Sequence, residues 1–371
     1  MDDEARDAGG LGSDRAWQGH SHRGRRSPFR HPRRDHAGGG DHRGPTYAAL
    51  DLGTNNCRLL VARPAGDGFR VIDAFSRIIR LGEGVSSSGR ISEAAIDRAL
   101  SALAVCRDKM RNRGVTRARL IATEACRAAT NAAEFRSRVS AEVGLDLEVV
   151  NRETEACLAA TGCTPLMDPQ STGVILFDIG GGSSELVRLD RSVPARGGPP
   201  VPTIRGWTSL PVGVVTLAER HGGHVVDRAL FDTMVDEVAE YVSRFAAEHG
   251  RDLDNMHMLG TSGTVTTIAG VYLALPRYDR RRVDGCWMRD VEVTSVVDRL
   301  VEMSYDERVA NPCIGSERAD LVLAGCAILD AIRRFFPCAR LRVADRGLRE
   351  GMLVQMMRDD GAWVGAGAGA P

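Results

Sequence analysis

Short apolar blocks separated by polar, glycine-bearing turns run along most of the chain and predict strands and helices in alternation. Residues 47–50 and 59–62 are apolar and flank a Gly/Thr/Asn turn, so they are predicted to form the two arms of a hairpin. Further short strands are expected at 69–75, 77–81, 120–122 and 147–150. Helices are expected after the N-cap residue Ser92, after Asn131 with Glu134 in a capping box, and over 153–162.

The same order of elements then begins again. Residues 174–177 form an apolar strand, which is followed by Asp178, three glycines, two serines and a second apolar run. The segment that starts at Asp178 aligns with the one that starts at Asp51, because both read Asp-x-Gly, a small polar turn and an apolar strand. Strands joined by a tight turn are antiparallel, so each sheet should be mixed. We therefore predict an internal duplication, with two similar α/β domains that each begin with a hairpin.

The remaining elements complete the second repeat. They are a helix capped by Asp227, a strand at 256–259, a turn at 260–264 that opens a helix, a helix from Ser316 to Phe335, a strand at 341–344 and a helix at 348–357. The predicted organisation is a disordered tail at 1–45, a first domain at 46–170, a second domain at 171–344, a C-terminal helix at 345–359 that packs back near the cleft, and a flexible tail at 360–371.

Composition excludes several classes of protein. Basic and acidic residues balance at 49 each among 371 residues, which argues against a general nucleic-acid binder. Lys109 is the only lysine, so neither a P-loop nor a Schiff-base lysine is expected. The nine cysteines never form a Cys-x-x-Cys pair, which argues against a zinc site or disulfide framework and fits a reducing cytoplasm. With no apolar run of about 18 residues and no export signal, we expect a cytoplasmic protein without membrane contact.

The first 45 residues differ in composition from the rest. Glycine, arginine, histidine and aspartate dominate this segment, and five of the nine histidines lie there. Such a segment cannot bury enough apolar surface to fold by itself, which favours a solvated tail or a misassigned start of the chain. Metal or polyanion binding by these histidines and arginines is the alternative.

The two Asp-x-Gly turns are the first candidates for chemistry. Their glycines let the backbone approach an anion closely, and inward-pointing N–H groups form an anion-binding nest. Asp51 and Asp178 would repel a phosphate directly, but they can hold Mg²⁺ or its waters. Two such turns facing each other across an interdomain cleft favour phosphate binding over a purely structural hairpin. The predicted phosphate-binding residues are Gly53, Thr54, Asn55 and Asn56 in one turn, and Gly180, Gly181, Gly182, Ser183 and Ser184 in the other.

Charged side chains near these turns are further candidates. Glu148 ends a strand, and Glu153 and Glu155 lie in the first turn of the next helix, where the helix dipole stabilises carboxylates. Helix capping is the alternative for Glu153. The apolar surroundings of Glu155 predict a buried carboxylate that can act as a general base for water. Arg58 and Arg80 adjoin glycine-bearing turns and are expected to grip a polyanion.

These residues together resemble the exopolyphosphatase/guanosine pentaphosphate phosphohydrolase (Ppx/GppA) family, in a short two-domain form, within the actin–Hsp70–sugar kinase superfamily. The matching stretches occur in family order and span nearly everything between the tails. They are 51–58 (DLGTNNCR), 80–84 (RLGEG), 122–127 (ATEACR) with Asn131, 152–156 (RETEA), 178–183 (DIGGGS), 210–213 (LPVG), 261–264 (TSGT), 317–320 (ERAD) and 345–351 (DRGLREG).

The resemblance implies two ribonuclease H-like domains with an interdomain cleft. It also implies hydrolysis there, with Mg²⁺, of a terminal phosphoanhydride bond of polyphosphate or guanosine pentaphosphate. Carried over by position, Glu155 resembles the family's catalytic glutamate, which positions and deprotonates the attacking water. The matching stretches add Cys57 to the phosphate-binding set and place the metal among Asp51, Glu124, Glu148 and Asp178.

Three positions depart from the family pattern. Asn56 and Ala344 stand where the family often has serine, and Cys157 stands where it often has arginine. Loss of an arginine beside the catalytic glutamate would weaken the grip on a polyanion or change the substrate. Longer members continue into further C-terminal domains, so we expect limited processivity on long polyphosphate. A phosphotransferase of the same fold and a non-catalytic sensor are the alternatives, while the choice of substrate and a homodimer stay open.

Overall fold

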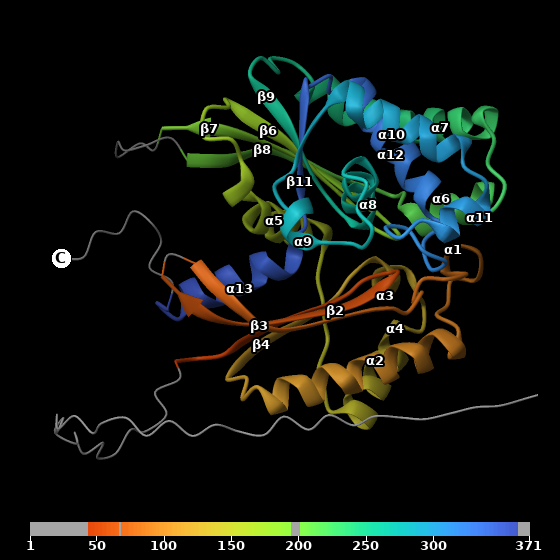
Figure 1. Cartoon of the computed structure of the whole chain (residues 1–371). Helices are drawn as coiled ribbons and strands as arrows, with labels where there is room; N and C mark the ends of the chain where they lie inside the picture. Colours follow the sequence, from red (N-terminus) through yellow and green to blue (C-terminus); the bar gives the residue numbers. More distant parts are fainter. Residues whose placement is uncertain (1–43, 67, 194–200, 363–371) are drawn as a thin grey trace, which may run out of the picture. The chain divides into compact units, whose positions relative to one another are not determined.

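Two mixed β-sheets organise the part of the chain that the computed structural model describes, residues 44–66, 68–193 and 201–362 (Figure 1). The first sheet has the order β3-β2-β1-β4-β5, with β1 Tyr47–Leu52, β2 Asn56–Ala65, β3 Gly68–Ile78, β4 Arg117–Ala122 and β5 Glu148–Val149. The second has the order β10-β11-β9-β6-β7-β8, with β6 Gly173–Ile179, β7 Ser184–Ser192, β8 Val201–Leu210, β9 Met256–Thr261, β10 Trp287–Arg289 and β11 Arg340–Ala344. Most of the two predicted tails, at 1–43 and 363–371, lies outside the described residues.

Both sheets repeat one topology. In the first sheet β1 is antiparallel to β2 and parallel to β4, and in the second β6 is antiparallel to β7 and parallel to β9. The pairing of β2 with β3 shifts register at Val61/Ala62, and that of β7 with β8 shifts at Arg188/Leu189. These shifts lie the same number of residues after Asp51 and Asp178. The shared irregularity supports the predicted duplication, and the predicted mixed sheets are confirmed.

Helices connect the strands (Figure 1). The first half contains α1 Val85–Ser88, α2 Glu93–Asn112, α3 Glu124–Ala128, α4 Ala132–Arg138, which continues into a π-helical turn at Val139–Val143, and α5 Arg152–Cys163, which continues into a 3₁₀ turn at Thr164–Leu166. The second half contains α6 Val214–His221, α7 Arg228–His249, α8 Gly263–Tyr272, α9 Arg280–Val283, α10 Asp290–Glu302, α11 Tyr305–Ala310, α12 Val322–Phe335 and α13 Leu348–Asp359. Ser92 and Asp227 cap α2 and α7 as predicted, since each side chain accepts a backbone N–H from the first turn.

Three local predictions are wrong. The side chain of Asn131 does not cap α4, because its amide exchanges two hydrogen bonds of 2.9 Å with the backbone of Ile91. Ser316 does not begin a helix, because tight turns follow Gly315 in its left-handed conformation and α12 starts only at Val322. The strands expected at 69–75 and 77–81 form the single strand β3, which ends at Ile78.

Two helices are exchanged between the repeats. We call strands β1–β5 with α1–α4 the first lobe, and strands β6–β11 with α6–α12 the second lobe. Helix α5 follows the first sheet in sequence, yet its Ala156, Ala160 and Cys163 join an apolar cluster with strands β6 and β7 of the second sheet. Helix α13 follows the second sheet, yet its Met352 and Met356 pack on β1 and β2 of the first (Figure 1). The core of each lobe is therefore completed by a helix that follows the other lobe's sheet in the sequence.

Helices α5 and α13 cross at glycines. A Cβ atom on Gly162 would lie 2.0 Å from the carbonyl oxygen of Gly347, and one on Gly351 would lie 2.0 Å from the carbonyl oxygen of Leu158. Both distances are far shorter than a carbon–oxygen contact, so no side chain fits at either position. The two helices thus touch backbone to backbone, beside the point where the chain passes from one lobe to the other.

We predict that Gly162→Ala and Gly351→Ala each lower the free energy of unfolding by about 1–3 kcal/mol, the usual cost of overpacking. Alanine gains about 1 kcal/mol over glycine inside a helix, so the same changes would stabilise the protein if the crossing were open. Gly68→Ala, whose Cβ would meet nothing closer than 3.9 Å, is the control. Equilibrium urea denaturation measures the difference, and a stabilised Gly162→Ala protein would contradict the close crossing.

Candidate active site

The turns of the two equivalent hairpins meet at one cavity. Its walls include Asp51 and residues 53–56 from the first turn, and residues 178–183 from the second. Thr54 is the point of contact: a Cβ atom on Gly181 would lie 2.8 Å from its Cβ, and one on Gly182 would lie 2.9 Å from its Oγ1. Only glycine lets the second turn approach the first this closely, so the glycines of the second turn create the contact between the lobes.

The two turns have matching backbone geometry. Gly53 N–H donates to the carbonyl of Asn56 at 2.8 Å, and Gly180 N–H donates to that of Ser183 at 2.9 Å. The carbonyls of Gly180 and Gly181 accept N–H groups from the first turn of α6. In contrast, the N–H groups of Thr54, Asn55, Gly181 and Gly182 have no partner among the described residues. Unpaired N–H groups from both turns that line one cavity form an anion-binding nest.

Four carboxylates with raised pKa values surround this nest, and a fifth, Glu124, lines the cavity in ion pairs with arginines. Asp51 on β1, Glu155 on α5, Asp178 on β6 and Glu185 on β7 all line the cavity. Burial, reinforced by the charge of Glu185, raises the pKa of Glu155 to about 8. Burial and the charge of Glu155 raise the pKa of Asp178 to about 7, and burial and the charge of Asp178 raise the pKa of Glu185 to about 7. Burial also raises the pKa of Asp51. The site therefore concentrates negative charge away from water.

The carboxylates differ in their partners. Glu155 Oε2 accepts a hydrogen bond of 2.7 Å from Arg127, and Glu185 Oε1 accepts the hydroxyls of Ser183 at 2.9 Å and Ser209 at 2.8 Å. The carboxylates of Asp51 and Asp178 accept no hydrogen bond from any described residue. These two acids therefore lack the compensation that buried charges normally require.

Glu185 is a site residue that the sequence analysis missed. It pairs with Asp178 across the second hairpin, just as Arg58 pairs with Asp51 across the first. The sequence contains a signal for Glu185, because the alignment of the two repeats puts it at the position of Arg58, a predicted phosphate-binding residue.

A larger cavity of about 850 Å³ adjoins the first and shares Asp51, Asn56, Arg58, Asp178 and Arg318 with it. Four arginines along it have no carboxylate within ion-pair distance among the described residues: Arg58, Arg77, Arg318 and Arg349. This second chamber therefore carries positive charge beside the acidic first one.

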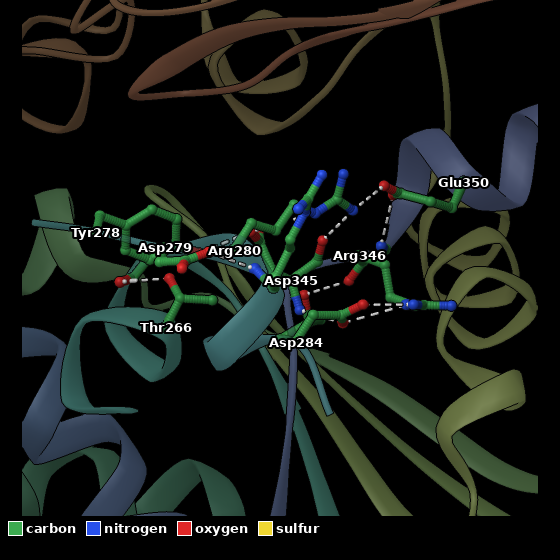
Figure 2. A network of polar contacts seen from close by, with 12 residues as sticks. Thr266, Tyr278, Asp279, Arg280, Asp284, Asp345, Arg346 and Glu350 are labelled. Atoms are coloured by element: carbon green, nitrogen blue, oxygen red, sulfur yellow. Dashed lines mark hydrogen bonds and ion pairs between the residues drawn. The ribbon is translucent and has the colours of Figure 1, made fainter. Parts of the chain in front are cut away.

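A polar network on the wall of the second chamber fixes the start of α13 (Figure 2). Tyr278 donates to Asp345 at 2.6 Å, and Arg280 donates to Glu350 at 3.0 Å. Glu350 also accepts the N–H of Gly347 at 2.9 Å, and Arg346 pairs with Asp284 of the second lobe. The network holds α13, which packs on the first lobe, to the end of β11 in the second.

Several predicted site residues lie elsewhere. Glu148 stands on an edge strand, half exposed, and both its oxygens bind Arg119 at 2.9 Å. Glu124 does line the cavity, but both its oxygens are taken by Arg127 and Arg152. Both carboxylates are thus paired with arginines, and their assignment as metal ligands stays a prediction.

Three of the predicted phosphate ligands also point elsewhere. The Arg80 guanidinium forms two hydrogen bonds, of 2.9 and 3.2 Å, with Asp320 of the second lobe. Strand alternation turns Cys57 into the core, where its Sγ lies 3.9 Å from that of Cys106. Ser184 is fully buried and donates to the carbonyl of Val212. The other predicted phosphate-binding residues, Gly53, Thr54, Asn55, Asn56, Arg58, Gly180, Gly181, Gly182 and Ser183, all line the cavity.

The fold and the cavity define a two-lobed α/β protein with an anion nest and buried acids between its lobes. The chain belongs to the Ppx/GppA phosphatase family, whose family model matches residues 60–360. It is 28% identical, with a TM-score of 0.69, to the Ppx/GppA family member of Aquifex aeolicus, a match that covers 85% of this chain and 98% of the other. The predicted α/β fold with two ribonuclease H-like lobes is confirmed.

Other similar proteins carry functional names. The chain is 26% identical over 317 residues to the guanosine-5'-triphosphate,3'-diphosphate pyrophosphatase of Aeromonas hydrophila, which covers 85% of this chain and 60% of that protein. A protein of the same name from Photobacterium profundum is 27% identical over 321 residues, covering 84% and 59%. The chain thus spans about 60% of the length of these relatives. An exopolyphosphatase from Cytophaga hutchinsonii, 23% identical, shares the fold with a TM-score of 0.75 over 85% and 98% of the two chains.

No helix in the described ranges is both long and apolar enough to cross a membrane.

We predict that Glu155→Gln stabilises the metal-free protein in a pH-dependent way. Folding raises the pKa of Glu155 to about 8, so the unfolded chain loses this proton at lower pH than the folded one. The resulting penalty is absent below the unfolded pKa of about 4.3 and grows as the pH rises toward 8. The melting temperature of Glu155→Gln should exceed that of the wild type at pH 8.5, and the two should converge at pH 4.5.

The exposed neighbour Glu153 provides the control for this measurement. Glu153→Gln should give no comparable gain at pH 8.5, because a solvated carboxylate has no burial penalty to remove. An equal gain in both variants would mean that Glu155 is not buried as described.

Proposed function

We propose that this protein is a Mg²⁺-dependent phosphohydrolase that releases orthophosphate from a terminal phosphoanhydride bond. The observation that carries the proposal is the pair of matched turns, whose unpaired N–H groups share one cavity with the buried acid Glu155. The names of the Aeromonas and Photobacterium relatives support a substrate of the guanosine pentaphosphate type. Polyphosphate presents the same terminal anhydride, so the proposal includes both substrates.

In this proposal the terminal phosphoryl group occupies the nest. The free N–H groups of Thr54, Asn55, Gly181 and Gly182 donate to its oxygens and stabilise the charge that they carry during transfer. Both lobes contribute donors, so the phosphoryl group is fully surrounded only when the two turns touch. This geometry supplies positioning and electrostatic stabilisation, which anhydride hydrolysis requires more than covalent chemistry.

Glu155 is the proposed general base. Its carboxylate lines the cavity, and its raised pKa makes it a stronger base than an exposed glutamate. It orients a water molecule toward phosphorus and accepts the proton as the water attacks. The shortened substrate is the leaving group, and it departs toward the second chamber. There Arg58, Arg318 and Arg349 offer positive charge to its phosphates.

The residues present fit Mg²⁺ if substrate completes its coordination. No group of three acidic, histidine or cysteine residues among the described residues forms a ready metal cage. Mg²⁺ commonly uses one or two carboxylates, together with waters and phosphate oxygens. Asp178 and Asp51, partly buried and without hydrogen bonds from the described residues, and Glu185 beside them would hold it. Bound there, the ion would neutralise phosphate charge.

We predict that Glu155→Gln lowers kcat by at least about 100-fold, in the range expected for loss of a general base. Phosphate release should be measured with Mg²⁺ on guanosine pentaphosphate, short polyphosphate and long polyphosphate, side by side. Glu153→Gln, two residues earlier on the same helix and exposed, is the matched control and should keep near wild-type turnover. Full activity of Glu155→Gln on every substrate that the wild type cleaves would refute the assigned mechanism.

We predict that Asp178→Asn raises the Mg²⁺ concentration for half-maximal activity by at least about tenfold. The amide retains the size of the side chain but loses the charge that a divalent cation needs. Asp190→Asn, on β7 outside the cavity, serves as the control. Activation by Mg²⁺ at the same concentration in the wild type and in Asp178→Asn would remove Asp178 from the metal site.

A further inference from the structure

Two short helical turns face each other beside the cavity and carry opposite charges at matched positions. On α3, Glu124 and Arg127 are three residues apart, and on the first turn of α5 Arg152 and Glu155 are also three residues apart. Residues at this spacing lie on the same face of a helix. The two faces meet with their charges crossed, so that each glutamate lies against an arginine of the other helix.

The contacts form an unbroken chain from the surface to Glu155. Arg152 donates to Glu124 Oε1 at 2.8 Å, and Glu124 Oε2 accepts Nε of Arg127 at 2.8 Å. Arg127 then donates from Nη1 to Glu155 Oε2 at 2.7 Å and to the carbonyl of Val150 at 2.9 Å. The side chains of Arg127 and Glu155 are each only 14% exposed, whereas that of Arg152 is 45% exposed.

Glu155 therefore has one oxygen engaged and one available. Oε2 is fixed by Arg127, while Oε1 accepts no hydrogen bond from any described residue. Arg127 itself is not part of the cavity wall, although Glu155 is. A guanidinium behind the carboxylate can therefore orient it without reaching a ligand in front of it.

The arrangement also links the position of Glu155 to both lobes. Its helix, α5, packs on the second sheet, whereas Arg127 belongs to α3 of the first lobe and also binds the carbonyl at the end of β5. The backbone of Glu155 is thus held by the second lobe through α5, and its carboxylate is held by the first lobe through Arg127. Movement of one lobe relative to the other would change where Oε1 points.

From this geometry we propose that Arg127 is the positioning residue of Glu155: it occupies Oε2, leaves Oε1 as the oxygen that takes the proton from water, and is itself held in place by Glu124. The inference rests on the proposed function, since it assigns a role to Arg127 only through the base Glu155. Other charged groups near Glu155 are Glu185, Asp51 and Asp178, all acidic. Arg127 is accordingly its one cationic hydrogen-bond partner among the described residues.

The test is a double-mutant cycle between Arg127→Met and Glu155→Gln, with kcat and KM measured for phosphate release in Mg²⁺. In the wild-type background, Arg127→Met should lower kcat by about 10- to 100-fold and change KM by less than about threefold, because substrate contacts are untouched. In the Glu155→Gln background, the same substitution should change kcat by less than about threefold, since residues that act as a unit are not additive.

Two further variants separate positioning from a general loss of structure. Arg127→Lys retains a charge near Oε2 and should recover part of kcat, and added guanidinium should partly restore Arg127→Ala but not Glu155→Gln. Arg119→Met is the matched control, because it removes another guanidinium that binds a glutamate through two bonds, away from the cavity. Its kcat should stay within about twofold of the wild type, as expected for a surface ion pair. If Arg127→Met fails to fold, the cycle is run with Arg127→Lys.

Each contrary result has a definite meaning. Equal, additive losses of kcat in both backgrounds, or a KM that rises at least tenfold, would show that Arg127 contacts the substrate itself and would overturn the inference. Wild-type kcat in Arg127→Met would also overturn it. If Glu155→Gln cleaves substrate at the wild-type rate, the proposed mechanism is refuted, and the positioning role of Arg127 with it. If Glu155→Gln is impaired while Arg127→Met is not, only the positioning role fails.

Discussion

Four carboxylates with raised pKa values line one cavity, and their proximity is the constraint on which the rest of the site depends. Like charges at close range in a poorly solvated space cannot all ionise without compensation, and the raised pKa values of Glu155, Asp178 and Glu185 express this cost. The unpaired N–H groups of the two turns attract an anion into the same space. A phosphate alone would add to the negative charge, whereas a phosphate that arrives with a divalent cation satisfies the nest and the acids together. A metal–phosphate pair, as in the proposed function, would therefore suit this cavity better than either component alone.

The duplication explains why such a site can exist between two lobes. Equivalent hairpins bring two copies of the same nest together, with the same closing hydrogen bond in each turn. The charges then differ at the equivalent strand position, where the first repeat has Arg58 and the second has Glu185. The backbones of the two turns are equivalent, but the opposite charges at this position make the two ends of the cleft electrostatically different. Its acidic end surrounds Glu155, and its basic end continues into the second chamber, so the attacking and leaving sides of a substrate meet different surroundings.

Features that depend on the local sequence could be predicted. Features that depend on a side-chain partner far away in the sequence could not. The Asp-x-Gly turns, the hairpins and the Ser92 and Asp227 caps follow from local chemistry, and each appears where expected. The same local rules misled at Asn131, because a backbone segment 40 residues away uses its amide. They also gave no sign of the arginine partners of Glu148 and Glu124, two residues predicted as metal ligands. Only the fold reveals that Arg119 in one case, and Arg127 with Arg152 in the other, already neutralise them.

The two turns touch in this structure, so separation of the lobes would widen the cavity for the proposed substrate. Contacts at the outer edge of the cleft, away from α5 and α13, include Arg80 with Asp320 and the Glu317 carbonyl, and Glu219 with the Gly84 N–H and the Ser86 hydroxyl. Each involves partly exposed side chains and is worth about 1 kcal/mol or less, so water can replace it at little cost. The inner edge is different, because α5 and α13 cross there backbone to backbone and each completes the core of the other lobe. Opening at the outer edge around this fixed crossing would separate the nests while both cores stay intact. It would also move Arg127 on α3 relative to α5, the helix that carries Glu155.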